Sequence, residues 1–138
     1  MELKIVIPLI PRSKKNSQQI VMVRAKNGGK RPMIIPSKAY KQYEKDCGWY
    51  LNNVDPFLSP CNVKCLYYMP THRRVDLVNL QEATLDILVR YGILIDDNST
   101  VVVSMDGSRV LYDKENPRTE IIITEVVDET EIKDAEMD

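Results

Sequence analysis

The order of strand-like and helix-like hydrophobic patterns limits the fold of this 138-residue chain more than any other feature. Alternating or β-branched segments predict strands at 2–8, 20–24, 31–35, 62–69, 100–104, 108–112 and 119–127. Apolar residues at helical spacing predict helices at 37–53 and 77–91. Because strands and helices do not alternate strictly, we predict an α+β fold, in which a mixed β-sheet carries two main helices mainly on one face.

Two glycine-containing turns predict hairpins. Asn27-Gly28-Gly29 separates the strands at 20–24 and 31–35, and Asn-Gly is a strong signal for a tight hairpin turn. Asp106-Gly107 lies between the segments at 100–104 and 108–112, so the same argument predicts a second hairpin there.

Both helices have recognisable ends and faces. Ser37 follows Pro36 and is a natural N-cap for the first helix, and Gly92 supplies a stop for the second. In the first helix, the stripe expected to enter the core is Tyr40, Tyr43, Cys47 and Tyr50. In the second, the arc expected to be buried is Leu77, Leu80, Thr84, Ile87, Leu88 and Tyr91, with Asn79, Glu82 and Asp86 roughly opposite.

Charge is distributed very unevenly along the chain. Residues 1–45 hold eleven Lys or Arg and two acids, whereas residues 128–138 hold six acids and one Lys. A basic segment and an acidic tail suit a nucleic-acid-binding protein, although a solvated surface explains the same charges. We expect one folded domain over 1–127 and a disordered acidic tail over 128–138.

Cysteine usage and hydropathy predict a cytoplasmic protein. Cys47, Cys61 and Cys65 are odd in number and form no CxxC pair, and His72 is the one histidine. This pattern argues against a disulfide framework and a zinc site. We identify no signal peptide and no apolar run near the ~20 residues needed to span a bilayer, so we expect no membrane association.

The segment 73–101 has the densest chemistry. Asp76 follows the basic pair Arg73-Arg74, and Asp96-Asp97 follows the second helix. Clustered carboxylates are ligands that Mg²⁺ prefers, and neighbouring arginines bind DNA phosphates. The simpler interpretation is that Asp76 is an N-cap and that Asp96-Asp97 belongs to an ordinary turn.

This segment, RRVDLVNLQEATLDILVRYGILIDDNSTVV, resembles the RusA family of Holliday junction resolvases. The resemblance implies a RusA-like endonuclease domain over 1–127, a homodimer that binds four-way DNA junctions, and paired nicks made with Mg²⁺ or Mn²⁺ in phage or prophage recombination and repair. It also implies that Asp76 and Asp97 are catalytic metal ligands, that Asp96 is the acidic neighbour, and that Asn79 is the motif asparagine.

Two positions depart from the family pattern. Val78 stands where the family usually has a second aspartate, and Glu82 stands where it usually has a functional lysine. Our hypothesis is that Glu82 replaces the missing metal ligand and shares catalysis with Asp76 and Asp97. The alternatives are a catalytically impaired protein that still binds junctions, and a structural phage or adaptor protein without preference for branched DNA.

We expect the basic residues to contact the DNA backbone and not to distinguish bases. The candidate DNA-binding residues are Lys14, Lys15, Asn16, Lys30, Arg31, Arg73 and Arg74.

Overall fold

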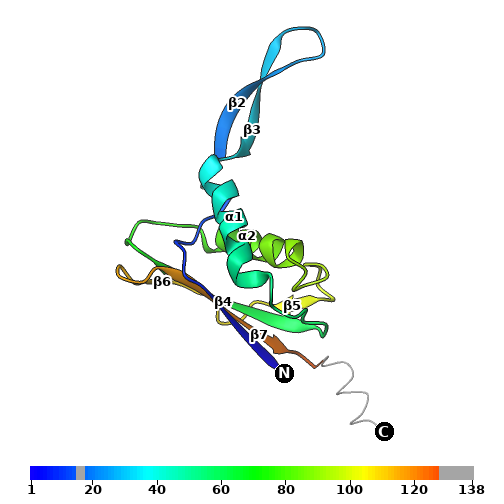
Figure 1. Ribbon diagram of the computed structural model, residues 1–138, viewed down its shortest axis with the longest axis vertical. Helices are drawn as coiled ribbons and strands as arrows, with labels where there is room; N and C mark the ends of the chain where they lie inside the picture. The colour runs from blue at the N-terminus through cyan, green and yellow to red at the C-terminus, as the bar shows by residue number, and fades with distance from the viewer. Residues whose placement is uncertain (15–17, 128–138) are drawn as a thin grey trace.

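The computed structural model describes residues 1–14 and 18–127, which form a five-stranded sheet, two helices and a separate hairpin (Figure 1). The predicted tail at 128–138, and the predicted DNA contacts Lys15 and Asn16, lie outside the described residues. The strands are β1 (Glu2–Ile7), β2 (Gln18–Arg24), β3 (Lys30–Pro36), β4 (Cys61–Met69), β5 (Val102–Ser104), β6 (Arg109–Tyr112) and β7 (Arg118–Glu125). The helices are α1 (Lys38–Leu51) and α2 (Leu77–Arg90). The predicted α+β class is confirmed.

The main sheet is mixed, as expected. Its strand order is β1-β7-β4-β5, and β6 also pairs with β4. β7 is antiparallel to both β1 and β4, whereas β5 and β6 are parallel to β4. The crossover from β4 to its parallel neighbours contains α2, because parallel strands cannot be joined by a tight turn.

One face of the sheet forms the core. Every second side chain of β4 is buried from Cys61 to Tyr67, and the matching residues of β7, from Thr119 to Ile123, are buried as well. Residues between them are only partly buried. Both helices lie on the same side of the sheet in Figure 1, which explains the alternation, since one face is covered by helices and the other is open.

Helix α1 begins as predicted and differs in its buried stripe. The Ser37 hydroxyl accepts a hydrogen bond from the Tyr40 N–H at 3.2 Å. Tyr40, Cys47 and Leu51 are buried, but Tyr50 is 40% exposed, so its predicted burial is wrong. At 100° per residue, Leu51 lies closer than Tyr50 to the centre of the buried stripe.

Helix α2 follows the prediction closely. Leu80, Thr84, Ile87 and Leu88 are buried, and Ala83 joins them. The Thr84 hydroxyl lies 2.7 Å from that of Tyr67 and so joins the helix to β4. Gly92 has a φ of +76°, a left-handed conformation that ends the helix at little cost.

The predicted hairpin at Asp106-Gly107 does not form. β5 and β6 do not pair with each other but follow one another along the same edge of β4. At the interruption between them, the Asn62 side chain accepts from the Asp106 N–H at 2.8 Å, and the Ser108 hydroxyl accepts from the Cys65 N–H at 3.0 Å. These side chains replace ladder bonds, so the glycine turn becomes a bulge in one edge strand.

Cys47, Cys61 and Cys65 are free and buried. No helix among the described residues is both long and apolar enough to cross a membrane.

Candidate functional site

The loop between β4 and α2 presents the first candidate group. Arg73 and Arg74 are exposed, as a role in binding phosphate requires. Two residues before Arg74, the His72 ring stacks on Tyr112 of β6, with ring centroids 3.9 Å apart and planes inclined by 26°. This contact fixes the loop to the sheet beside the two arginines.

A hollow of about 310 Å³ lies at this loop. Its cationic lining residues are Arg12, Arg73 and Arg74, and its lining contains no acid. Val75 and Leu80 also line it, which places the start of α2 at its border. Three guanidinium groups around one hollow favour an anion, and planar guanidinium groups suit phosphate oxygens in particular.

Asp76 is the N-cap of α2. Its Oδ1 atom accepts hydrogen bonds from the N–H groups of Val78 at 3.0 Å and Asn79 at 3.3 Å. The prediction that Asp76 is an N-cap is therefore confirmed. Both bonds end at Oδ1, so the cap does not use Oδ2, and the residue is exposed. Capping the helix and contacting a ligand are compatible roles for this carboxylate.

Asp96 and Asp97 lie in the loop between α2 and β5. The Asp96 carboxylate accepts from the Asp97 N–H at 2.7 Å and from the Asn98 amide at 2.9 Å. Both bonds lower the pKa of Asp96, and the bond from the Asp97 backbone N–H contributes more than the one from Asn98. Asp96 thus organises this loop, and both aspartates are exposed.

The chain holds Asp76 and Asp97 at opposite ends of α2. That helix has fourteen residues and is about 21 Å long at 1.5 Å per residue. The strand after Asp97 joins the first residue of β4, because Val102 pairs with Cys61. It is β6 that lies beside the last residues of β4, next to the Arg73–Asp76 loop. Figure 1 shows the two loops, green and yellow, on opposite sides of the molecule.

Within one protomer the predicted ligands do not assemble. Across residues 1–14 and 18–127, no three His, Cys, Asp or Glu residues are grouped so that they could hold a metal ion. The donors present in a single chain therefore do not fit a metal site on their own. The metal roles of Asp76, Glu82, Asp96 and Asp97 stay predictions.

Glu82 belongs to a polar cluster between α1 and α2. Lys14 lies 3.0 Å from Asp86 Oδ2 and 5.9 Å from the centroid of the Tyr40 ring. Burial raises the pKa of Tyr40 to about 12, and the negative charges of Asp86 and Glu82 contribute to the rise. Val78, Glu82 and Asp86 are spaced by four residues and share one side of α2.

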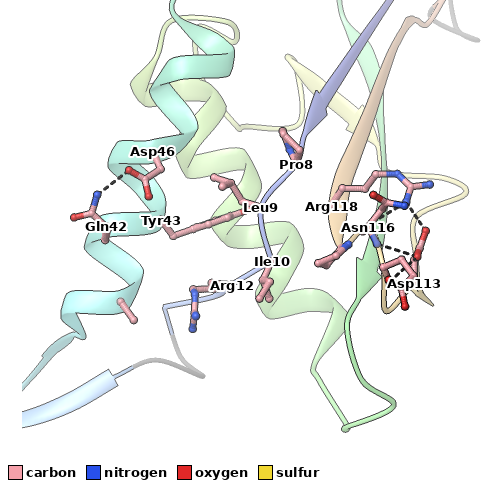
Figure 2. A pocket seen from close by; sticks show the side chains of 13 residues that line it. Pro8, Leu9, Ile10, Arg12, Gln42, Tyr43, Asp46, Asp113, Asn116 and Arg118 are labelled. Atoms are coloured by element: carbon pink, nitrogen blue, oxygen red, sulfur yellow. Dashed lines mark hydrogen bonds and ion pairs between the residues drawn. The ribbon is translucent and has the colours of Figure 1, made fainter.

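A second, larger cleft lies between the segment after β1, α1 and the loop before β7 (Figure 2). Its volume is about 860 Å³, but its lining mixes cations with the acids Asp46, Asp113 and Glu115. Arg118 is engaged there, since it donates to Asp113 and Glu120 and lies 3.7 Å from the centroid of the Tyr68 ring. The mixed charge makes this cleft a poorer phosphate site than the smaller hollow.

The structure thus separates the described site residues into four places. Arg73, Arg74 and Asp76 are at the start of α2, and Asp96 and Asp97 are beyond its end. Lys14 and Glu82 are in the cluster between α1 and α2, and Lys30 and Arg31 are on the β2–β3 hairpin. Sequence reasoning did not include Arg12 among the DNA contacts. The sequence did indicate Arg12 as a candidate, because Arg12 belongs to the same polar, basic loop as Lys14.

Comparison with known proteins supports the resemblance of residues 73–101 to the RusA family. The family of endodeoxyribonuclease RusA matches residues 5–124 of the 138 in the chain. No curated protein matches significantly. The match includes every predicted site residue and nearly all of the main sheet and both helices. The chain therefore belongs to the RusA family of endodeoxyribonucleases, which implies a nuclease that resolves Holliday junctions.

Proposed function

We propose that this protein is a divalent-metal-dependent endonuclease that resolves four-way DNA junctions by paired nicks, in phage or prophage recombination and repair. One observation carries the proposal within the family: the exposed Asp76 directly follows Val75, which lines a hollow whose charged lining residues are all arginine. A carboxylate beside a phosphate site is the arrangement that phosphodiester hydrolysis needs.

The arginines position the substrate in this scheme. Arg12, Arg73 and Arg74 hold a backbone phosphate in the hollow, with no base contact required. Bidentate contacts from guanidinium groups fix the phosphate's orientation as well as its place. Asp76 directly follows Val75, which lines the hollow. The helix cap uses only Oδ1 of Asp76, so Oδ2 is the atom that we propose for the reaction.

We further propose that a second copy of the chain completes the site. Asp76 caps the start of α2 and Asp97 follows its end, and their two loops lie on opposite sides of the molecule in Figure 1, so in this proposal one protomer does not use both aspartates at one phosphate. In a homodimer, Asp76 of one protomer and Asp97 of its partner would meet. Mg²⁺ or Mn²⁺ bound among carboxylates would supply the positive charge that stabilises the reacting phosphate and lowers the pKa of a bound water.

Glu82 is the proposed substitute for the carboxylate missing at Val78. It lies one helical turn beyond Val78 on the same side of α2. Helical side chains lean toward the N-terminus, so the Glu82 side chain covers the turn of α2 that holds Val78. A Glu82→Gln protein with wild-type cleavage and metal affinity would contradict this role.

The first experiment is cleavage of a labelled four-way junction with Mg²⁺ or Mn²⁺ by the wild type and by Asp97→Asn. Symmetric nicks that the substitution abolishes would support the proposal. Tight junction binding without nicks in the wild type would favour the alternative, a catalytically impaired binding protein marked by Val78.

A mixing experiment tests the shared site. Asp76→Asn and Asp97→Asn proteins are each expected to be inactive. In a heterodimer of the two, a composite arrangement leaves one site with both aspartates intact, so single nicks should return. A mixture as inactive as its components would show that each site lies within one protomer.

A further inference from the structure

The β2–β3 hairpin stands apart from the folded body. β2 and β3 pair only with each other, and Figure 1 shows them extending away from the sheet beyond the start of α1. Seven residues in each strand give an arm about 24 Å long. An isolated two-stranded hairpin is marginally stable in water, so an arm of this length indicates a binding partner.

One face of this arm is aliphatic and exposed. Ile20 pairs with Ile34, and Met22 pairs with Pro32, so the four side chains share a face. Ile20 is 71% exposed, Ile34 63% and Met22 59%. None of these side chains can form a hydrogen bond, so the face can recognise a partner only by apolar packing.

The far end of the arm is cationic. Arg24 pairs with Lys30, and Lys26 and Arg31 lie beside them, whereas residues 18–36 contain no acid. Two such arms packed together would bring like charges close, which disfavours a second copy of the chain as the occupant. An anionic partner that also offers flat apolar surfaces satisfies both parts of the arm.

We propose that the β2–β3 hairpin is a DNA arm that inserts its Ile20–Met22–Pro32–Ile34 face at the open centre of a branched junction. This inference rests on the proposed function and names how the substrate is recognised. In a continuous duplex the faces of the bases are stacked and hidden, whereas a branch point exposes them. Aliphatic side chains pack against unstacked bases in other DNA complexes, and a β-ribbon fits a DNA groove. The cationic tip holds the adjoining phosphates.

The test separates the face from the tip. Affinity is measured over a salt titration for a four-way junction and for a linear duplex with the same arm sequence. Ile20→Ser/Met22→Ser/Ile34→Ser should lose roughly tenfold or more of the preference for the junction while keeping its duplex affinity. Lys30→Gln/Arg31→Gln should weaken both complexes and reduce the salt slope by about 1.8.

Met33→Ser is the matched control. Met33 lies on the opposite face of the arm and is 46% exposed, so this variant should keep the preference for the junction. A second measurement uses the wild type alone: 2-aminopurine placed at the branch point should change its fluorescence on binding, because side chains packed against the base alter its stacking.

Three results would overturn the inference: unchanged junction preference in the triple variant, equal loss in Met33→Ser, or no change in 2-aminopurine fluorescence. Conversion of a dimer to a monomer by the triple variant, measured by sedimentation, would instead assign the face to a second copy. If the wild type itself shows no preference for the junction, the proposed function fails and not the arm alone.

Discussion

Asp76 is expected to have two separable roles, helix cap and catalytic carboxylate, and substitutions can separate them. Asp76→Asn keeps a side-chain oxygen that can accept from the Val78 and Asn79 N–H groups, and Asn caps helices about as well as Asp. Asp76→Ala removes both bonds and should cost about 1 kcal/mol of folding free energy. For a domain of this size, that corresponds to a Tm lowered by about 3–4 °C.

Cleavage should not follow stability in this pair. We expect both Asp76 variants to lose junction cleavage, although only Asp76→Ala loses the cap. Ser37→Ala is the matched control, because Ser37 caps α1 through the Tyr40 N–H and should lose a similar free energy while still cleaving. Thermal unfolding and single-turnover cleavage, both measured well below the Tm, give the two quantities. Wild-type cleavage by Asp76→Asn would refute the catalytic role and leave Asp76 as a cap alone.

Three further outcomes follow from the structure. Lys14→Gln should flatten the salt slope of DNA binding by about 0.9, and Asp86→Asn, which frees the Lys14 ammonium, should tighten binding; unchanged slopes would remove Lys14 from the interface. Burial raises the pKa of Cys65 from 9.0 to about 11, so the unfolded thiol ionises first and stability should fall as the pH rises above 9. Denaturant titrations at pH 8 and 10 check this, with Cys65→Ala as the variant that should lose part of the dependence. Deleting residues 128–138 should tighten DNA binding if the acidic tail competes for the basic surface, and equal affinities would argue against competition.

The alternation of the sheet was predictable because it is a local property. In β4, side chains two residues apart point to the same face of the sheet. The alternation from Cys61 to Tyr67 therefore indicates a strand with one buried face, whichever strands it pairs with. The caps at Ser37 and Asp76 and the stop at Gly92 are equally local, since each depends on bonds within a few residues.

The interrupted edge strand shows where local signals fail. Asp106-Gly107 has the composition of a hairpin turn, yet β5 and β6 both pair with β4. Gly107 does adopt a positive φ of 87°, so the local conformation suits glycine. What the turn signal cannot specify is which strand receives the two segments, and here the Asn62 and Ser108 side chains bridge the gap on β4.

The sequence by itself determined the kinds of residue available for chemistry, a basic loop ending at Asp76 and a second pair of aspartates after α2. Tertiary structure alone decided their distances. It joined Arg12 to Arg73 and Arg74 in one hollow, paired Lys14 with Asp86, and kept the loops that carry Asp76 and Asp97 on opposite sides of the molecule. The physical reason is that spacing along the chain fixes local geometry, whereas the approach of distant segments depends on which strands share an edge of the sheet.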